Sequence, residues 1–168
     1  MGIAYSAAHW SAFGTTVATA CAALAGFLFI AVSINLREIL AEENSNLPGR
    51  AALTLILFGT PLVSSLLLIV PGQTRLALGL ELLLAGLLIG TVQIVLDLRA
   101  GSSEEDTLLR RMLGRIGPAA TSSACLLIAG ATLLAQAGGG LYWLVPSALV
   151  AIVFGLLNVW VLLVEILR

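Results

Sequence analysis

At residues 76–98 the chain reads LALGLELLLAGLLIGTVQIVLDL, a run in which only Glu81 and Asp97 are charged. A helix needs about 20 predominantly apolar residues to cross roughly 30 Å of hydrocarbon, and this run is long enough for one crossing. The run lacks the strict alternation of apolar and polar residues that is typical of a barrel strand. Backbone polar groups in lipid must pair within the segment itself, so the run predicts a transmembrane α-helix.

Four similar runs surround this one, and together they predict an all-α, polytopic transmembrane bundle of five helices. The 168 residues are 60% hydrophobic and 10% charged, and their mean hydropathy is +1.08. Soluble domains are only about 45–50% apolar. No polar stretch between the runs is long enough for a soluble domain, so we expect residues 1–168 to form a single transmembrane domain. The predicted spans cover approximately residues 13–37, 51–71, 76–98, 117–137 and 142–167.

The distribution of arginine predicts the orientation of the bundle. If the N-terminus lies outside, seven of the eight arginines fall on the cytoplasmic side, and only Arg75 falls outside. Short cytoplasmic loops of membrane proteins carry an excess of basic residues. Because the number of spans is odd, the C-terminus is then cytoplasmic.

The longest loop is predicted to contain a short interfacial helix at about residues 104–116. Apolar residues recur on one face of this segment, and Arg110, Arg111 and Arg115 occupy the other. This pattern is typical of a helix that lies in the membrane interface with its arginines toward lipid headgroups. A docking surface for a partner protein is the alternative interpretation.

Several polar residues within the predicted spans form a candidate inner cluster. They belong to the first, third and fifth spans and all map to the predicted cytoplasmic half: Asn35, Gln93, Asp97, Asn158 and Glu165. Hydrogen bonds and ion pairs that close the inner end of the bundle would account for them. A polar vestibule that opens to the cytoplasm is the alternative.

Glu81 lies apart from this cluster, about six residues or ~9 Å below the predicted outer end of its span. A charged side chain within a bilayer is costly and therefore marks either a structural pairing or a functional site. We expect Glu81 to be protonated, to face water or to have a partner, and Arg75 is the nearest candidate partner in the sequence. An ion path that uses Glu81 and the inner cluster is the alternative.

Small residues mark the faces on which helices are expected to approach closely. Gly79, Gly86 and Gly90 share one face of the third span, and Gly26 belongs to a similar stripe in the first. Such stripes occur at helix contacts within a bundle and between copies alike. Besides the lipid bilayer, the expected partners are therefore a second copy of the chain or a larger membrane complex.

The sequence contains no recognisable set of catalytic, metal-binding or cofactor-binding residues. The only histidine is His9, and the two cysteines, Cys21 and Cys125, lack the spacing of a zinc or redox site. The net charge is −1 and the arginines are dispersed, which argues against a nucleic-acid partner. We expect a protein that is not an enzyme and that holds no cofactor.

Three segments carry a family resemblance: LAGFLFIAVSINL at residues 24–36, LPGRA at 47–51 and VPGQ at 70–73. They resemble a family of uncharacterised small multi-helix membrane proteins of actinobacteria, some of which are labelled modulators of the FtsH membrane protease. The resemblance covers roughly residues 10–100. It implies a multi-pass protein of a bacterial plasma membrane, and it implies no functional residues.

Two functional hypotheses follow. The first is a non-enzymatic membrane scaffold or regulatory, accessory subunit that acts through helix association. The alternative is a small oligomeric ion channel or transporter that uses Glu81 and the inner polar cluster. The two differ in whether a water-filled path joins Glu81 to Gln93 and Asp97.

Overall fold

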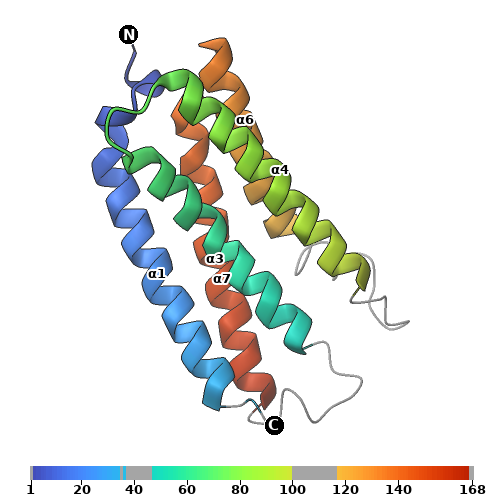
Figure 1. Cartoon of the computed structure of the whole chain (residues 1–168). Coiled ribbons are helices and arrows are strands. Elements are labelled where there is room, and N and C mark those ends of the chain that lie inside the picture. Colours follow the sequence, from blue (N-terminus) through green and yellow to red (C-terminus); the bar gives the residue numbers. More distant parts are fainter. Residues whose placement is uncertain (1, 35, 37–46, 100–116, 167–168) are drawn as a thin grey trace.

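In the part of the chain that it describes, the computed structural model of the protein is a bundle of five long α-helices (Figure 1). It describes residues 2–34, 36, 47–99 and 117–166. The helices are α1 (Ser11–Ile34), α3 (Leu47–Ile69), α4 (Arg75–Arg99), α6 (Gly117–Ala135) and α7 (Leu144–Ile166). Each is long and apolar enough to cross a membrane, which confirms the predicted all-α architecture with five spans.

Most of the observed helix ends differ from the predicted ends by a few residues. α1 is preceded by two 3-10 turns, η1 (Ile3–Tyr5) and η2 (Ala7–Trp10), and α7 is preceded by the 3-10 turn η4 (Gly140–Trp143). α3 begins at Leu47 rather than at residue 51, because Pro48 is tolerated in a first helical turn, where its missing N–H needs no partner.

Some of the predicted features lie outside the described residues. They are the interfacial helix at about residues 104–116 with Arg110, Arg111 and Arg115, and also Asn35.

α3 is the central helix, and it contacts all four of the others. α1 packs on one side of it and the pair α4 and α6 on the other, while α7 packs against α3 and α6 (Figure 1). The face that α3 buries is rich in small hydroxyl residues, namely Thr54, Thr60, Ser64 and Ser65. Thr60 Oγ1 donates to the carbonyl of Ile56 at 2.9 Å, so its hydroxyl is satisfied within the helix. Small residues with satisfied hydroxyls allow the neighbouring helices to approach α3 closely.

The N-terminal residues and the C-terminal end of α7 lie at opposite ends of the bundle (Figure 1). The N-terminal end also carries the turn between α3 and α4 and the turn between α6 and α7. Trp10 is the centre of this end: its ring makes edge-on contacts with Phe13 and Tyr142, with centroids 5.5 and 4.9 Å away. Its Nε1 donates to the carbonyl of Ile3 at 3.0 Å, which ties the first residues to the bundle.

The arginine asymmetry predicts that this N-terminal end faces outside the cell, and cysteine labelling tests the prediction. A membrane-impermeant maleimide should label Gly2→Cys and Ala137→Cys in intact cells, and it should label Ser103→Cys only after permeabilisation. The native Cys21 and Cys125 are 0% and 7% exposed and should give little background. The reverse labelling pattern would contradict the predicted orientation.

Candidate functional site

Glu81 lies near the N-terminal end of α4 and is half-buried. Its Oε2 accepts a hydrogen bond from Nε2 of Gln73, which belongs to the turn between α3 and α4. Gly72 allows this turn because it adopts a φ of 69°, and Thr74 caps α4 by accepting from the backbone N–H of Ala77 at 3.2 Å. The turn thus brings an amide donor to the carboxylate of Glu81, and the carboxylate is paired without a charged partner.

Arg75 has a different partner. Its guanidinium faces the side-chain amide of Gln136, whose oxygen, turned toward the arginine, accepts from both Nη1 and Nη2. Gln136 follows the last residue of α6 and has a left-handed φ of 56°, as is common just after a helix end. The pair therefore joins the start of α4 to the end of α6. No ion pair between Arg75 and Glu81 occurs in the part of the chain that the structure describes.

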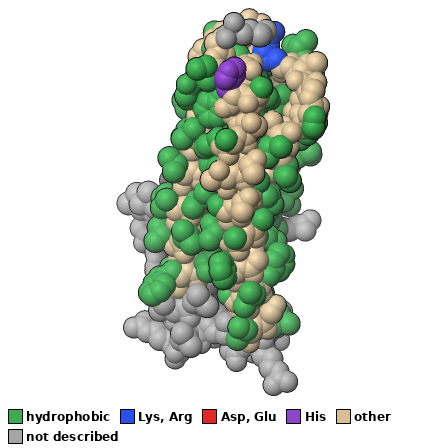
Figure 2. Space-filling model, turned by 90° about the vertical axis from the view of Figure 1, so that its left-hand side faces the viewer, with side chains coloured by type: hydrophobic (Ala, Val, Ile, Leu, Met, Phe, Trp, Pro, Cys, Tyr) green, Lys and Arg blue, Asp and Glu red, His purple; other side chains and the backbone are tan. Residues whose placement is uncertain are grey.

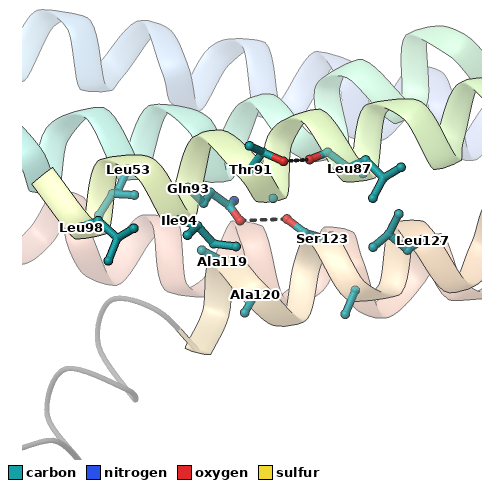
Figure 3. Close-up of a pocket in the computed structure, with 13 residues that line it drawn as sticks. Leu53, Leu87, Thr91, Gln93, Ile94, Leu98, Ala119, Ala120, Ser123 and Leu127 are labelled. Carbon is teal, nitrogen blue, oxygen red and sulfur yellow. Dashed lines mark hydrogen bonds between the residues drawn. The ribbon is translucent and has the colours of Figure 1, made fainter.

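Gln93 is the member of the predicted inner cluster that the structure places most clearly. It is 6% exposed, and its Oε1 accepts a hydrogen bond from Ser123 Oγ of α6 at 2.8 Å (Figure 3). The amide Nε2 of the same side chain is buried and has no hydrogen-bond partner among the described residues. Gln93 therefore links α4 to α6 and keeps one hydrogen-bond donor unused.

A pocket of about 370 Å³ surrounds this amide between α4 and α6 (Figure 3). Apart from Gln93, Thr91 and Ser123, its lining is apolar or glycine and includes Leu53 of α3, Gly90 and Leu127. A Cβ built on Gly90 would meet only the Cβ of Ser123, at 3.8 Å, so the glycine leaves space that a side chain would fill. The pocket thus combines an apolar lining with an unused donor.

The other predicted cluster residues are not brought together with Gln93 in the described part of the chain. Asn158 is half-buried on α7, which packs against α3 and α6, and no hydrogen bond joins it to Gln93. Asp97 and Glu165 belong to α4 and α7, but their side chains lie outside the description, as does the whole of Asn35.

Serines that the sequence analysis did not single out make the polar contacts of α6. Besides Ser123, Ser122 is fully buried, and its hydroxyl lies 3.0 Å from that of Ser147 on α7. Ser147 Oγ also lies 3.0 Å from the carbonyl of Ser122 and donates to it in this arrangement. In the sequence, these serines could have been noticed as hydroxyl residues in otherwise apolar spans. Their hydrogen-bond partners, however, are distant in sequence and are identified only by the packing of the helices.

The glycines of α4 are used inside the chain. A Cβ on Gly79 would lie 2.6 Å from Leu134, and one on Gly86 would lie 2.8 Å from Leu127, both on α6. On α6 itself, a Cβ on Gly130 would lie 2.8 Å from the carbonyl oxygen of Gly79. The predicted close packing at Gly79 and Gly86 is thus an α4–α6 contact within one copy, which leaves neither residue free to contact a second copy.

Gly26 lies in a different environment, since no atom of the described residues approaches within 4 Å of a Cβ built on it. It belongs to a row of exposed small residues along one side of α1, here called the α1 face: Thr15, Thr19, Ala22, Ala23 and Gly26. Thr15 Oγ1 and Thr19 Oγ1 donate back to carbonyls of their own helix at 3.0 and 2.8 Å, so no hydroxyl of this face needs an outside partner. Figure 2, which views the α1 side, shows backbone and polar side chains exposed in a stripe between hydrophobic ones.

The described residues contain no group of three or more His, Cys, Asp or Glu placed to hold a metal ion. Glu81 and Gln93 each form a hydrogen-bonded polar pair, and the α1 face is a surface suited to apolar contact. Comparison with protein-family models, curated proteins and solved structures finds no match to the chain.

Proposed function

We propose that the protein is a non-enzymatic membrane scaffold or accessory subunit that associates with other transmembrane helices through the α1 face. The observation that carries the proposal is the exposure of this face, whose small residues are covered by none of the helices that the structure describes. Without a hydrophobic driving force in lipid, helices associate by close van der Waals contact, which small residues permit. A second copy of the chain or a helix of a larger complex fits such a face.

The lipid-exposed sides of α4 and α7 contrast with the α1 face. α4 exposes large side chains such as Leu80, Leu84 and Leu88, and α7 exposes Leu149 and Trp160. Large flexible apolar side chains are well solvated by acyl chains, whereas a row of small residues leaves backbone close to the surface. The contrast supports α1 as the helix that meets a partner.

Local pairing of the polar side chains also supports a scaffold over an ion path. Glu81 is paired with Gln73 and Gln93 with Ser123, and the two sites are twelve residues or ~18 Å apart along α4. Between them, α4 presents Leu82 to the core at 0% exposure. A water-filled path between the two sites would have to displace these packed apolar groups.

The test compares two alanines that are both exposed and both lie within a helix, Ala23 on the α1 face and Ala131 on α6. Ala23→Ile should weaken association by roughly tenfold or more, because a branched side chain separates the backbones that the small residue lets approach. Ala131→Ile adds the same volume elsewhere and should leave association within about twofold. The measurement is energy transfer between labelled full-length chains in vesicles, with mass analysis of proteins that co-purify.

A wild-type protein that is monomeric and purifies without a stoichiometric partner would contradict the proposal. If Ala23→Ile and Ala131→Ile changed the strength of association equally, the interface would not lie on the α1 face. A cation flux in vesicles that the wild type supports and Glu81→Gln abolishes would favour the ion-path hypothesis instead.

A further inference from the structure

The pocket between α4 and α6 is a groove with a buried floor and exposed walls. Leu53 and Ala119 of the floor are 7% and 5% exposed, whereas Leu87, Ile94 and Leu98 of the walls are 57%, 63% and 73% exposed. The lining runs along α4 from Gly86 to Leu98, which corresponds to ~18 Å of helix. Its volume of about 370 Å³ lies within the range of small-molecule sites, about 300–1,000 Å³. An elongated apolar group can therefore enter it sideways from the membrane.

Among the described residues, one polar atom of this groove has no hydrogen-bond partner, and it is a donor. Gln93 Nε2 is buried without a hydrogen bond, while the hydroxyls of Ser123 and Thr91 already donate to Gln93 Oε1 and to the carbonyl of Leu87, at 2.8 and 2.7 Å. Figure 3 shows this amide among the apolar side chains of the lining. A buried water needs two to four polar partners, and this mostly apolar lining offers few. The missing partner is better supplied by an acceptor oxygen on a molecule that also fills the groove.

The lining restricts the chemistry of that molecule. Among the residues that the structure describes, the lining has no charged side chain, so an uncharged acceptor fits it better than a free carboxylate. We infer that the groove binds one acyl chain of a membrane phospholipid, whose ester carbonyl accepts a hydrogen bond from Gln93 Nε2. The acyl chain fills the space beside Gly90, and the headgroup lies toward the C-terminal end of α4.

The depth of Gln93 agrees with an ester carbonyl. α4 has 25 residues and is therefore ~37 Å long, which exceeds a hydrocarbon core of roughly 30 Å. A core centred on α4 would end ~4 Å from each end of the helix, so Gln93, six residues or ~9 Å from the C-terminal end, lies ~5 Å below the boundary at which the glycerol esters begin. The groove lies on a different side of the bundle from the α1 face, so this inference does not depend on the proposed association.

The test compares an ester with an ether. The full-length protein in mild detergent is titrated with dioleoyl phosphatidylglycerol and with its dialkyl ether analogue, which lacks the carbonyls, and bound lipid is counted by native mass spectrometry. The wild type should bind the ester roughly three- to tenfold more tightly, which is the range of one hydrogen bond. In Gln93→Leu this preference should disappear, with ether binding nearly unchanged.

Gly90→Leu fills the groove and should weaken binding of both lipids roughly tenfold or more, whereas Ala131→Leu, also on a lipid-exposed side, should change neither. Equal binding of ester and ether by the wild type would overturn the assignment of Gln93. Unaltered lipid binding in a folded Gly90→Leu would overturn the groove as the site. A disulfide between two copies of Ala120→Cys, formed in place of lipid binding, would show that a second chain covers it and would likewise overturn the inference.

Discussion

Gly130→Ala will destabilise the bundle by roughly 2–3 kcal/mol, although alanine is the better helix former. The added Cβ would lie 2.8 Å from the carbonyl oxygen of Gly79 and 3.0 Å from the backbone nitrogen of Leu83. Backbone atoms cannot rotate away as a side chain can, so α4 and α6 must move apart along their contact. Equilibrium unfolding of the full-length protein in mixed micelles measures the loss.

Gly90→Ala is the matched control for this variant. It is the same substitution in the partner helix, but its Cβ would meet only Ser123 Cβ at an ordinary 3.8 Å. We expect it to be neutral or to stabilise the bundle by about 0.5–1 kcal/mol, since alanine loses less backbone entropy than glycine on folding. If both variants had the same stability, the α4–α6 contact at Gly130 would not be as close as the structure has it.

The second large effect is expected where α3 meets α7. Gly155 of α7 lies against the ring of Phe58, which is 0% exposed, and any side chain on Gly155 would overlap that ring. Gly155→Leu should therefore cost roughly 3 kcal/mol or more, because the enclosed ring has no free volume to move into. Phe58→Ala alone should cost about 3–5 kcal/mol through the cavity that it leaves.

The double variant Phe58→Ala, Gly155→Leu exchanges the large and the small partner. It should be more stable than the sum of the two single changes predicts, with a coupling of roughly 1–3 kcal/mol, because the new leucine fills the vacated space. The same unfolding measurement on all four proteins gives the coupling. Strict additivity would mean that the two residues do not share one packing site.

The spans were predictable because a bilayer imposes a length and an apolar composition on every helix that crosses it. The contacts between the helices were less predictable. Gly26 and Gly79 lie in similar sequence surroundings, yet Gly79 is covered by Leu134 and Gly26 by none of the described residues. The order of the helices in space cannot be derived from local composition. The close packing expected at Gly86 could have been within the chain or between copies, and the structure places it within the chain, against Leu127.

For the polar residues, too, the residues themselves could be predicted but their hydrogen-bond partners could not. Glu81 and Gln93 stood out because a polar residue in an apolar run is conspicuous. Their partners did not: Gln73 reaches Glu81 through a turn, and Ser123 reaches Gln93 from a helix thirty residues away. Hydroxyl residues are common in transmembrane helices, so the hydrogen bond that a serine makes can be assigned only once its neighbour in the structure is known.

The central position of α3 has a consequence for biosynthesis. α3 and α6 both bury residues against α7, the ring of Phe58 in front of Gly155 and the hydroxyl of Ser122 beside that of Ser147. α7 follows the other four helices in the sequence, and chains generally fold from the N-terminus as they are made. Until α7 has left the ribosome and entered the membrane, these groups face lipid without their partners. A nascent chain that stalls before α7 thus leaves the hydroxyl of Ser122 and the ring of Phe58 without the contacts that they have in the finished bundle.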